Sequence, residues 1–258
     1  MLLTEEVIDS LHHFRLAMMT RLVKALQSRG YPAHGREIGS GYASYPGFGS
    51  CLAQAYGVGR GDAEFDLSEL DGFYTDRADN WELIVTPFDS PRVLQDAIKI
   101  GYTPDHFETV LAMTVGPKHH DVPPEFEIEE CKGDLQDWIR ACDSAWTERT
   151  DLTDETSEIM RISTANSARR YLARVNGEPA ATAALLEIDG RYLFAGAATR
   201  PQYRGRGLQG ALTQRRLADA GEGAFVQVVA LPGSQSHRNL QRTGFQPLYS
   251  KLVLLRRG

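Results

Sequence analysis

One short segment, YRGRGLQGAL at residues 203–212, combines residue types and a spacing that could bind a phosphorylated ligand. It contains the pattern G-x-G-x-x-G at Gly205, Gly207 and Gly210. Glycines let consecutive backbone N–H groups approach an anion closely, and a helix that begins just after them adds the positive end of its dipole. Arg204 and Arg206 add positive charge. The segment therefore predicts a phosphate-binding loop.

A dinucleotide is the first ligand to consider, because G-x-G-x-x-G is also the fingerprint of NAD- and FAD-binding folds. Those folds need the loop directly after their first strand, and an acidic residue about 20 positions further on at the end of the next strand. Here the next expected strand ends in VVALPGS, which has no acid. The chain after the loop is also too short to complete a doubly wound sheet. The sequence therefore disfavours a dinucleotide.

The elements around the loop indicate an α/β (α+β) fold with mixed sheets flanked by helices on both faces. Residues 31–50 read as irregular strands and turns. Expected helices cover residues 4–29, 66–78, 90–100, 134–147, 154–164, 208–220 and 234–242. Expected strands cover residues 51–59, 81–87, 106–115, 126–133, 169–177, 179–190, 191–199, 225–231 and 248–256.

Local signals fix several of these boundaries. Thr4 is expected to cap the first helix, and Ser90 with the following proline is expected to begin another. Asn176-Gly177 and Asp189-Gly190 are typical of two-residue hairpin turns. In the helix at 134–147, helical spacing predicts one buried face, formed by Leu135, Trp138, Ile139, Cys142 and Trp146.

The chain also contains two segments with the same order of elements. Residues 81–113 and 224–256, which are 143 positions apart, both read as strand, turn, helix, Gly-aromatic-x-Pro and strand. The proline-rich segment at 116–125 is the best candidate for a linker. We therefore predict two similar domains, residues 1–118 and 119–258.

Two motifs of the second half resemble the GNAT N-acetyltransferase superfamily. The acetyl-CoA loop of that family has the pattern Q/R-x-x-G-x-G/A, which Arg204 and Gly207 match, whereas Gln209 stands where Gly or Ala is usual. SHRNLQRTGF at 236–245 resembles the family's second coenzyme-binding helix, but Leu240 replaces a tyrosine that often serves as general acid. The resemblance implies coenzyme contacts from Ala197, Ala198, Thr199, Arg204, Gly205, Arg206, Gly207, Leu208, Gln209, Gly210, Ser236 and Asn239.

The resemblance implies an enzyme that moves an acetyl group from acetyl-CoA to a primary amine of a small molecule or peptide by direct attack, without a metal. Tyr249 as general acid and Glu187 as base are the catalytic candidates, although Glu187 also fits a solvated strand face. The first half looks like a degenerate GNAT-like domain. It is not expected to bind coenzyme A, because Asp62, Glu64 and Asp66 would repel a pyrophosphate.

Two other functions remain open. The missing tyrosine leaves a noncatalytic acyl-CoA-binding or sensing protein as the alternative. A nucleic-acid-binding module is a third possibility, because residues 195–258 contain ten Lys and Arg but two Asp and Glu. Their few aromatic residues are not interleaved as stacking platforms, so we expect no nucleic acid. Three cysteines without C-x-x-C spacing and the absence of a long apolar run predict a cytoplasmic protein without a membrane span, and an oligomer is possible.

Overall fold

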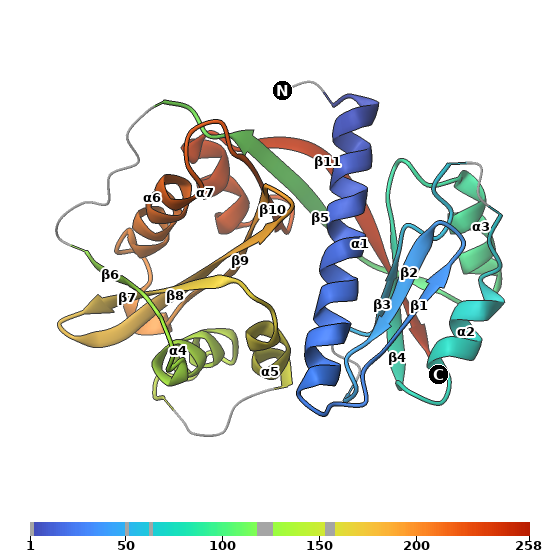
Figure 1. The fold of residues 1–258 in the computed structure, drawn as a ribbon, viewed down its shortest axis with the longest axis horizontal. Helices are drawn as coiled ribbons and strands as arrows, with labels where there is room; N and C mark the ends of the chain where they lie inside the picture. The colour runs from blue at the N-terminus through green and yellow to red at the C-terminus, as the bar shows by residue number, and fades with distance from the viewer. Residues whose placement is uncertain (1–2, 50–51, 62–63, 118–125, 153–157) are drawn as a thin grey trace. The chain divides into compact units, whose positions relative to one another are not determined.

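The computed structural model describes residues 3–49, 52–61, 64–117, 126–152 and 158–258. The chain forms two compact units, which we describe separately (Figure 1). The first unit comprises Met1–Leu111, Val229–His237 and Pro247–Gly258, and the second comprises Ala112–Val228 and Arg238–Gln246. The final strand of the chain therefore belongs to the first unit. The predicted domain boundary at 118/119 lies outside the described residues and stays a prediction.

The first unit is built on a sheet with the strand order β1-β2-β3-β4-β11-β5. Its strands are β1 (His34–Ile38), β2 (Gly41–Tyr45), β3 (Gln54–Tyr56), β4 (Asn80–Val85), β5 (Thr103–Thr114) and β11 (Gln246–Arg257). Its helices are α1 (Glu5–Ser28), α2 (Ser68–Tyr74) and α3 (Pro91–Lys99). The β3–β4 pair is parallel and the β4–β11 pair antiparallel, so the sheet is mixed.

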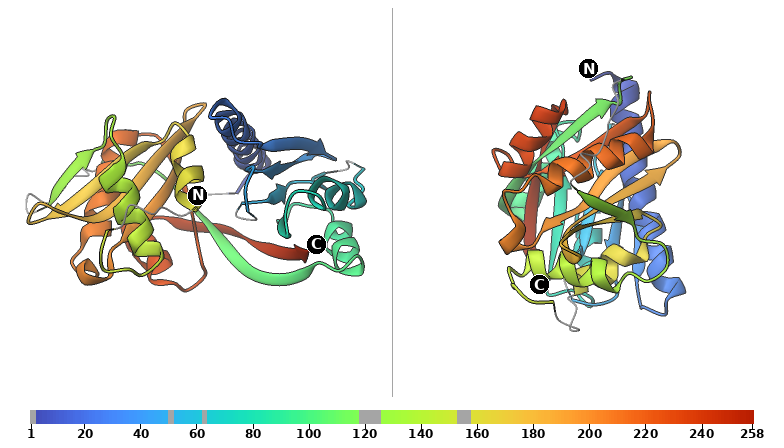
Figure 2. Two further views of the ribbon diagram at one scale, coloured as in Figure 1. Left: turned by 90° about the horizontal axis from the view of Figure 1, so that it is seen from below. Right: turned by 90° about the vertical axis from the view of Figure 1, so that its left-hand side faces the viewer.

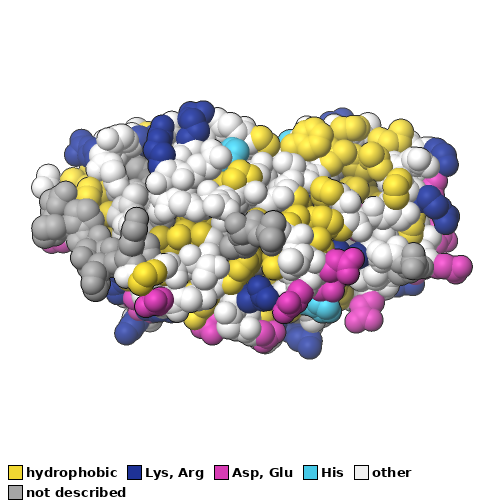
Figure 3. Space-filling view, turned by 90° about the horizontal axis from the view of Figure 1, so that it is seen from above, with side chains coloured by type: hydrophobic (Ala, Val, Ile, Leu, Met, Phe, Trp, Pro, Cys, Tyr) yellow, Lys and Arg dark blue, Asp and Glu magenta, His cyan; other side chains and the backbone are white. Residues whose placement is uncertain are grey.

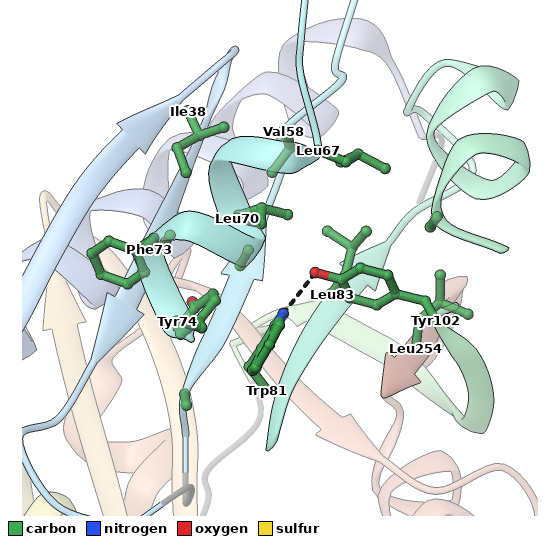
Figure 4. Packing of buried hydrophobic residues seen from close by; sticks show 14 of the residues in the cluster. Ile38, Val58, Leu67, Leu70, Phe73, Tyr74, Trp81, Leu83, Tyr102 and Leu254 are labelled. Atoms are coloured by element: carbon green, nitrogen blue, oxygen red, sulfur yellow. Dashed lines mark hydrogen bonds between the residues drawn. The ribbon is translucent and has the colours of Figure 1, made fainter. Parts of the chain in front are cut away.

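The sheet of the first unit has two covered faces. α2 and α3 enclose an apolar core in which the indole N–H of Trp81 donates to the hydroxyl of Tyr102 at 2.7 Å (Figure 4). α1 covers the opposite face, where Met19 packs on Tyr56 and Ile84 (Figure 2). The predicted helix starts are confirmed, because Thr4 Oγ1 accepts from the N–H of Val7, and Ser90 Oγ accepts from that of Arg92.

His12 makes the first unit sensitive to acid. It is 7% exposed, with its ring 5.4 Å from that of Tyr56. Burial, and then the charge of Arg60, lower the pKa of His12 from 6.5 to about 4. Between these two values the unfolded chain binds the proton and the folded protein does not. Its contribution to stability is therefore lost as pH falls from 6.5 to 4, by about 3 kcal/mol in total.

We expect His12→Phe to remove most of this pH dependence, because the phenyl ring keeps the packing and cannot be protonated. Urea unfolding of both proteins between about pH 7 and about pH 4.5 measures the effect. His13 is exposed on the same helix, so His13→Phe is the matched control and should leave the pH dependence unchanged. If the free energy of unfolding changed with pH to the same extent in the wild type and in His12→Phe, His12 would not be the source of the pH dependence.

The second unit contains a sheet with the order β10-β9-β8-β7-β6. Its strands are β6 (Glu127–Glu130), β7 (Arg169–Val175), β8 (Glu178–Ile188), β9 (Arg191–Thr199) and β10 (Phe225–Ala230). Its helices are α4 (Gln136–Trp146), α5 (Glu158–Ala165), the short 3-10 helix η1 (Pro201–Tyr203), α6 (Leu208–Ala220) and α7 (Gln235–Thr243). Both predicted hairpin turns are present. Asn176 and Asp189 have φ of 53° and 51°, and each is followed by a glycine with positive φ.

α4 and α6 lie on opposite faces of this sheet (Figure 1). Trp138 on α4 is 1% exposed, and its indole N–H donates to the carbonyl of Ala183 at 3.2 Å. Arg216 on α6 is 2% exposed, and its guanidinium lies 3.9 Å from the centre of the Phe194 ring. The prediction that Trp146 is buried is wrong, because this side chain is 58% exposed.

The described surface carries several large apolar side chains. Leu94 and Ile98 on α3 and Phe107 on β5 are exposed in the first unit. Figure 3 shows one face of the molecule, on which hydrophobic side chains gather in one area and charged side chains are scattered. No described helix is long and apolar enough to cross a membrane. The prediction of an oligomer stays open.

Candidate functional site

The loop between β9 and α6 has the backbone that its glycines predicted. Gly205 and Gly207 have φ of 78° and 82°, a region that other residues rarely adopt. Gly207 is the N-cap of α6, which begins at Leu208 as predicted. Leu208 is 2% exposed, so it offers a ligand only its backbone.

The loop presents a row of unused hydrogen-bond donors. In the described part of the chain, no acceptor bonds to the backbone N–H groups of residues 205–210. A Cβ atom added at Gly205 or at Gly210 would meet no atom within 4 Å, so the space beside both residues is open. These N–H groups surround the positive end of the α6 dipole. The arrangement can bind an anion with several oxygens, such as a pyrophosphate.

The arginines of the loop have different surroundings. Arg200 is 5% exposed and donates to the carbonyls of Pro179 and Thr150, so it supports the loop from inside. Arg204 lies 3.2 Å from a carboxylate oxygen of Glu148. Arg206 lies over the ring of Tyr203 at 5.4 Å and has no carboxylate partner among the described residues. Arg206 is therefore the arginine whose charge is available to an anion, whereas Glu148 competes for Arg204.

The strand before the loop separates from its neighbour. β9 pairs with β10 only from Arg191 to Phe194 and continues unpaired on that side to Thr199. Its register with β8 also shifts, because Thr182 faces Ala198 while Ala184 faces Ala195. The extra residues include Gly196, with φ of 58°, and the predicted site residue Ala197, which is exposed. This bulge leaves backbone polar groups that an extended ligand could bind.

Gln209 connects the loop to the separated strand. Its amide nitrogen lies 2.8 Å from the carbonyl oxygen of Ala198, 3.1 Å from the hydroxyl of Thr199 and 3.2 Å from the carbonyl oxygen of Thr182. A glycine or alanine here could make none of these contacts. The carbonyl of Ala198, one of the predicted coenzyme contacts, therefore already has a donor in this chain.

The two predicted contacts from α7 fall in different units, because the residues of this helix up to His237 belong to the first unit and those from Arg238 to the second. Ser236 is exposed, and the side-chain oxygen of Asn239 accepts from Arg242 at 2.9 Å. His237, which the sequence analysis did not single out, accepts from the N–H of Gly233 through Nδ1 at 2.9 Å. This bond places the ring proton on Nε2, which is enclosed without an acceptor. A histidine four residues after the glycine is too weak a pattern to reveal this donor.

The two predicted catalytic side chains belong to different units of the chain. Tyr249 is in the first unit, where its hydroxyl bonds to that of Tyr56, and burial raises the pKa of Tyr249. Glu187 is exposed on β8, opposite Tyr192. It lies five residues along the strand from Thr182, or ~17 Å at the rise of a strand. The roles of both residues stay predictions.

In the corresponding turn of the first half, Gly57–Gly61, side chains of the protein occupy the space beside Gly57 and Gly59, whereas the space beside Gly61 is open. A Cβ atom at Gly57 would lie 2.3 Å from the ring of His12, and one at Gly59 would lie 2.2 Å from Val93. Glu64 and Asp66 follow this turn, and Asp62 lies outside the described residues. No group of three or more His, Cys, Asp or Glu residues in the described chain could hold a metal ion.

Comparison with known proteins identifies the fold. No protein-family model and no curated protein matches the sequence. A GCN5-related N-acetyltransferase from Kribbella flavida has a TM-score of 0.63 at 17% identity, over 94% of this chain and 95% of its own. One from Sphaerobacter thermophilus has a TM-score of 0.56 at 16% identity, over 79% and 72%. A tandem GNAT protein from the clavulanic acid biosynthesis pathway has a TM-score of 0.59 at 10% identity, over 94% and 95%. The chain therefore has the GNAT fold.

Proposed function

We propose that the second half of this chain binds acetyl-CoA at the loop between β9 and α6. The observation that carries the proposal is the row of six backbone N–H groups, from Gly205 to Gly210, that have no described acceptor, with open space beside Gly205 and Gly210. A pyrophosphate supplies oxygens that such donors bind, and Arg206 adds an unpaired positive charge. The GNAT fold supports this ligand over a dinucleotide.

The reaction that we propose is transfer of the acetyl group to a primary amine of a small molecule or peptide. The neutral amine attacks the carbonyl carbon of the acetyl-CoA thioester directly. The C–N bond forms, the C–S bond breaks, and the proton lost by the amine ends on the departing thiolate, so that the products are the N-acetylated amine and free coenzyme A. The exposed backbone of the β9 bulge would hold the extended arm of this substrate, and Gln209 would fix the strand's position. The protein's main contribution would be to hold the reactants in register, which can supply ~7–11 kcal/mol of the barrier.

We also propose that the first half is a GNAT-like domain that does not bind coenzyme A, with domains at 1–118 and 119–258. Three elements support an internal repeat. β4, α3 and β5 correspond to β10, α7 and β11 in order and length, and β5 and β11 begin 143 residues apart, at 103 and 246. In the first half, the side chain of His12 fills the space beside Gly57, and that of Val93 fills the space beside Gly59. One of the similar structures is a tandem GNAT protein, which is consistent with this organisation.

A noncatalytic acyl-CoA-binding protein is the second candidate. The observation that favours it is the surroundings of the proposed acid and base. Tyr249 forms a hydrogen bond with Tyr56, and burial raises the pKa of Tyr249, which makes it difficult to deprotonate. Glu187 is exposed and pairs with Tyr192, so it lies away from the β9 bulge. Turnover of acetyl-CoA with any amine of a panel would exclude this candidate, whereas binding without turnover would support it.

Thermal melting with acetyl-CoA tests the proposal directly. At about 100 times its Kd, acetyl-CoA should stabilise the protein by ~2.7 kcal/mol. NADH and ATP are the comparison ligands, because both carry phosphates and adenine but lack the thioester arm. We expect a shift in Tm with acetyl-CoA and none with NADH. No shift with acetyl-CoA, or a larger one with NADH, would overturn the proposed function.

A further inference from the structure

The first unit places charged side chains on the face of its sheet that α1 covers. Gln54 on β3 and Glu82 on β4 are register partners, so their side chains share a face. Glu82 also partners Leu255 on β11, four residues from Lys251, which puts Lys251 on this face too. The guanidinium of Arg15 on α1 donates to the side-chain oxygen of Gln54. The opposite face holds the apolar core.

A buried ion pair forms the base of this polar cluster. Lys251 is 5% exposed, and its Nζ lies 2.8 Å from a carboxylate oxygen of Glu108 on β5. Burial, and then the neighbouring Arg15, lower the pKa of Lys251 to about 8. The partner carboxylate satisfies this ammonium, so Lys251 and Glu108 neutralise each other. Arg15 on α1 and Glu82 on β4 also carry charge in this cluster.

Arg15 uses part of its hydrogen-bonding capacity inside the protein. One terminal nitrogen donates to Gln54, while Nε is enclosed without a partner. No described residue accepts from the other terminal nitrogen, which is not enclosed. A guanidinium has five N–H donors in a planar fork that fits a carboxylate. Arg15 therefore has an unsatisfied edge suited to a carboxylate.

Glu82 is the complementary group. It is half-buried, and its carboxylate makes no hydrogen bond or ion pair with a described residue. Burial raises the pKa of Glu82, while the charges of Arg15 on α1 and of Asp105, His106 and Glu108 on β5 act on it from a distance. A carboxylate in such a position gains most from a ligand that brings a positive charge.

We propose that Glu82 and Arg15 bind a small molecule that carries both a primary ammonium group and a carboxylate, the chemical class of a free amino acid. Glu82 accepts from the ammonium and Arg15 donates to the carboxylate. The spacing is suitable, because Arg15 is bonded to Gln54, whose strand lies ~4.8 Å from that of Glu82.

Calorimetric titration with free L-amino acids tests the site. The methyl ester of any amino acid that binds removes the carboxylate, and its N-acetyl derivative removes the ammonium. We expect binding of at least one amino acid, and Glu82→Gln should weaken it ~10- to 100-fold through loss of a charge-assisted hydrogen bond. Glu37→Gln changes an exposed carboxylate on β1 and is the matched control. No binding of any amino acid, or equal binding by Glu82→Gln, would overturn the proposal.

Arg15→Lys provides a second variant that keeps the positive charge and loses the planar fork. It should weaken binding of the amino acid and leave binding of its methyl ester unchanged, because only the former has a carboxylate. Equal weakening of both would show that Arg15 supports the fold rather than the ligand and would overturn its assignment. Acetyl-CoA titrations of the same variants separate the two proposals. Failure of acetyl-CoA binding in the wild type would overturn the proposed function and leave the amino-acid result standing.

Discussion

Gly210→Glu is expected to abolish acetyl-CoA binding while the protein stays folded. Gly210 is the third residue of α6, has no positive φ, and an added Cβ there would meet open space. Replacing a glycine inside a helix favours folding by up to ~1 kcal/mol, and an acidic residue in the first turn adds ~0.3–1 kcal/mol. The new carboxylate would stand where the pyrophosphate is proposed to bind. At ~4 Å two like charges repel by about 4 kcal/mol near a protein surface, which is about a thousandfold in Kd.

Titration of acetyl-CoA into the variant measures the loss, and urea unfolding measures the stability. Gly72→Glu makes the same change in α2 of the first unit, where a Cβ atom also meets open space. This control should bind acetyl-CoA like the wild type. Gly210→Ala adds bulk without charge and should lose much less affinity than Gly210→Glu. Wild-type affinity in Gly210→Glu would place the coenzyme elsewhere and contradict the proposed site.

Much of the local structure follows from signals that lie within a few residues of one another. The start of α6 at Leu208 depends on Gly207, which alone tolerates the backbone that precedes the helix. Asn176 and Asp189 adopt positive φ because each hairpin twist requires it. These interactions are short-range, so the sequence was sufficient to predict them.

Features that depend on distant contacts could not be predicted in this way. Helical spacing predicted that Trp138 and Trp146 are both buried. The buried face of α4 is narrower than predicted and includes Trp138 but not Trp146. No local pattern links Arg204 to Glu148, which is 56 residues earlier in the chain. The polar cluster with Glu82 draws side chains from α1, β3, β4, β5 and β11, so only the folded structure brings them together.

Gln209 shows how a departure from a family pattern can be interpreted once the structure is known. In the sequence it only weakened the resemblance, because Gly or Ala is usual at that position. In the structure its amide holds the end of β9 next to β8, through contacts with Ala198, Thr199 and Thr182. Because Gln209 makes three contacts that a glycine or alanine could not make, we expect it to make the site more rigid before a ligand binds.

Trp138→Ala is expected to destabilise the protein by ~3–5 kcal/mol, because it removes a large side chain from a closed core. The indole is 1% exposed, and its N–H satisfies the carbonyl of Ala183. It also lies directly under the bulge, since a Cβ atom at Gly196 would be 2.9 Å from the indole. The cavity would therefore form beneath the strand that is proposed to hold the coenzyme's arm, and acetyl-CoA affinity should fall together with stability.

Trp146→Ala is the matched control, because Trp146 is the same residue type on the same helix and is 58% exposed. We expect it to change the free energy of unfolding by less than ~1 kcal/mol, as is usual for exposed positions. Trp138→Phe separates the two functions of the indole, since phenylalanine keeps most of the volume and loses the N–H. It should cost ~1–3 kcal/mol from the carbonyl left without a donor. If Trp138→Ala and Trp146→Ala lowered the free energy of unfolding equally, the core would not pack around Trp138. The β9 bulge would then not be supported by this indole.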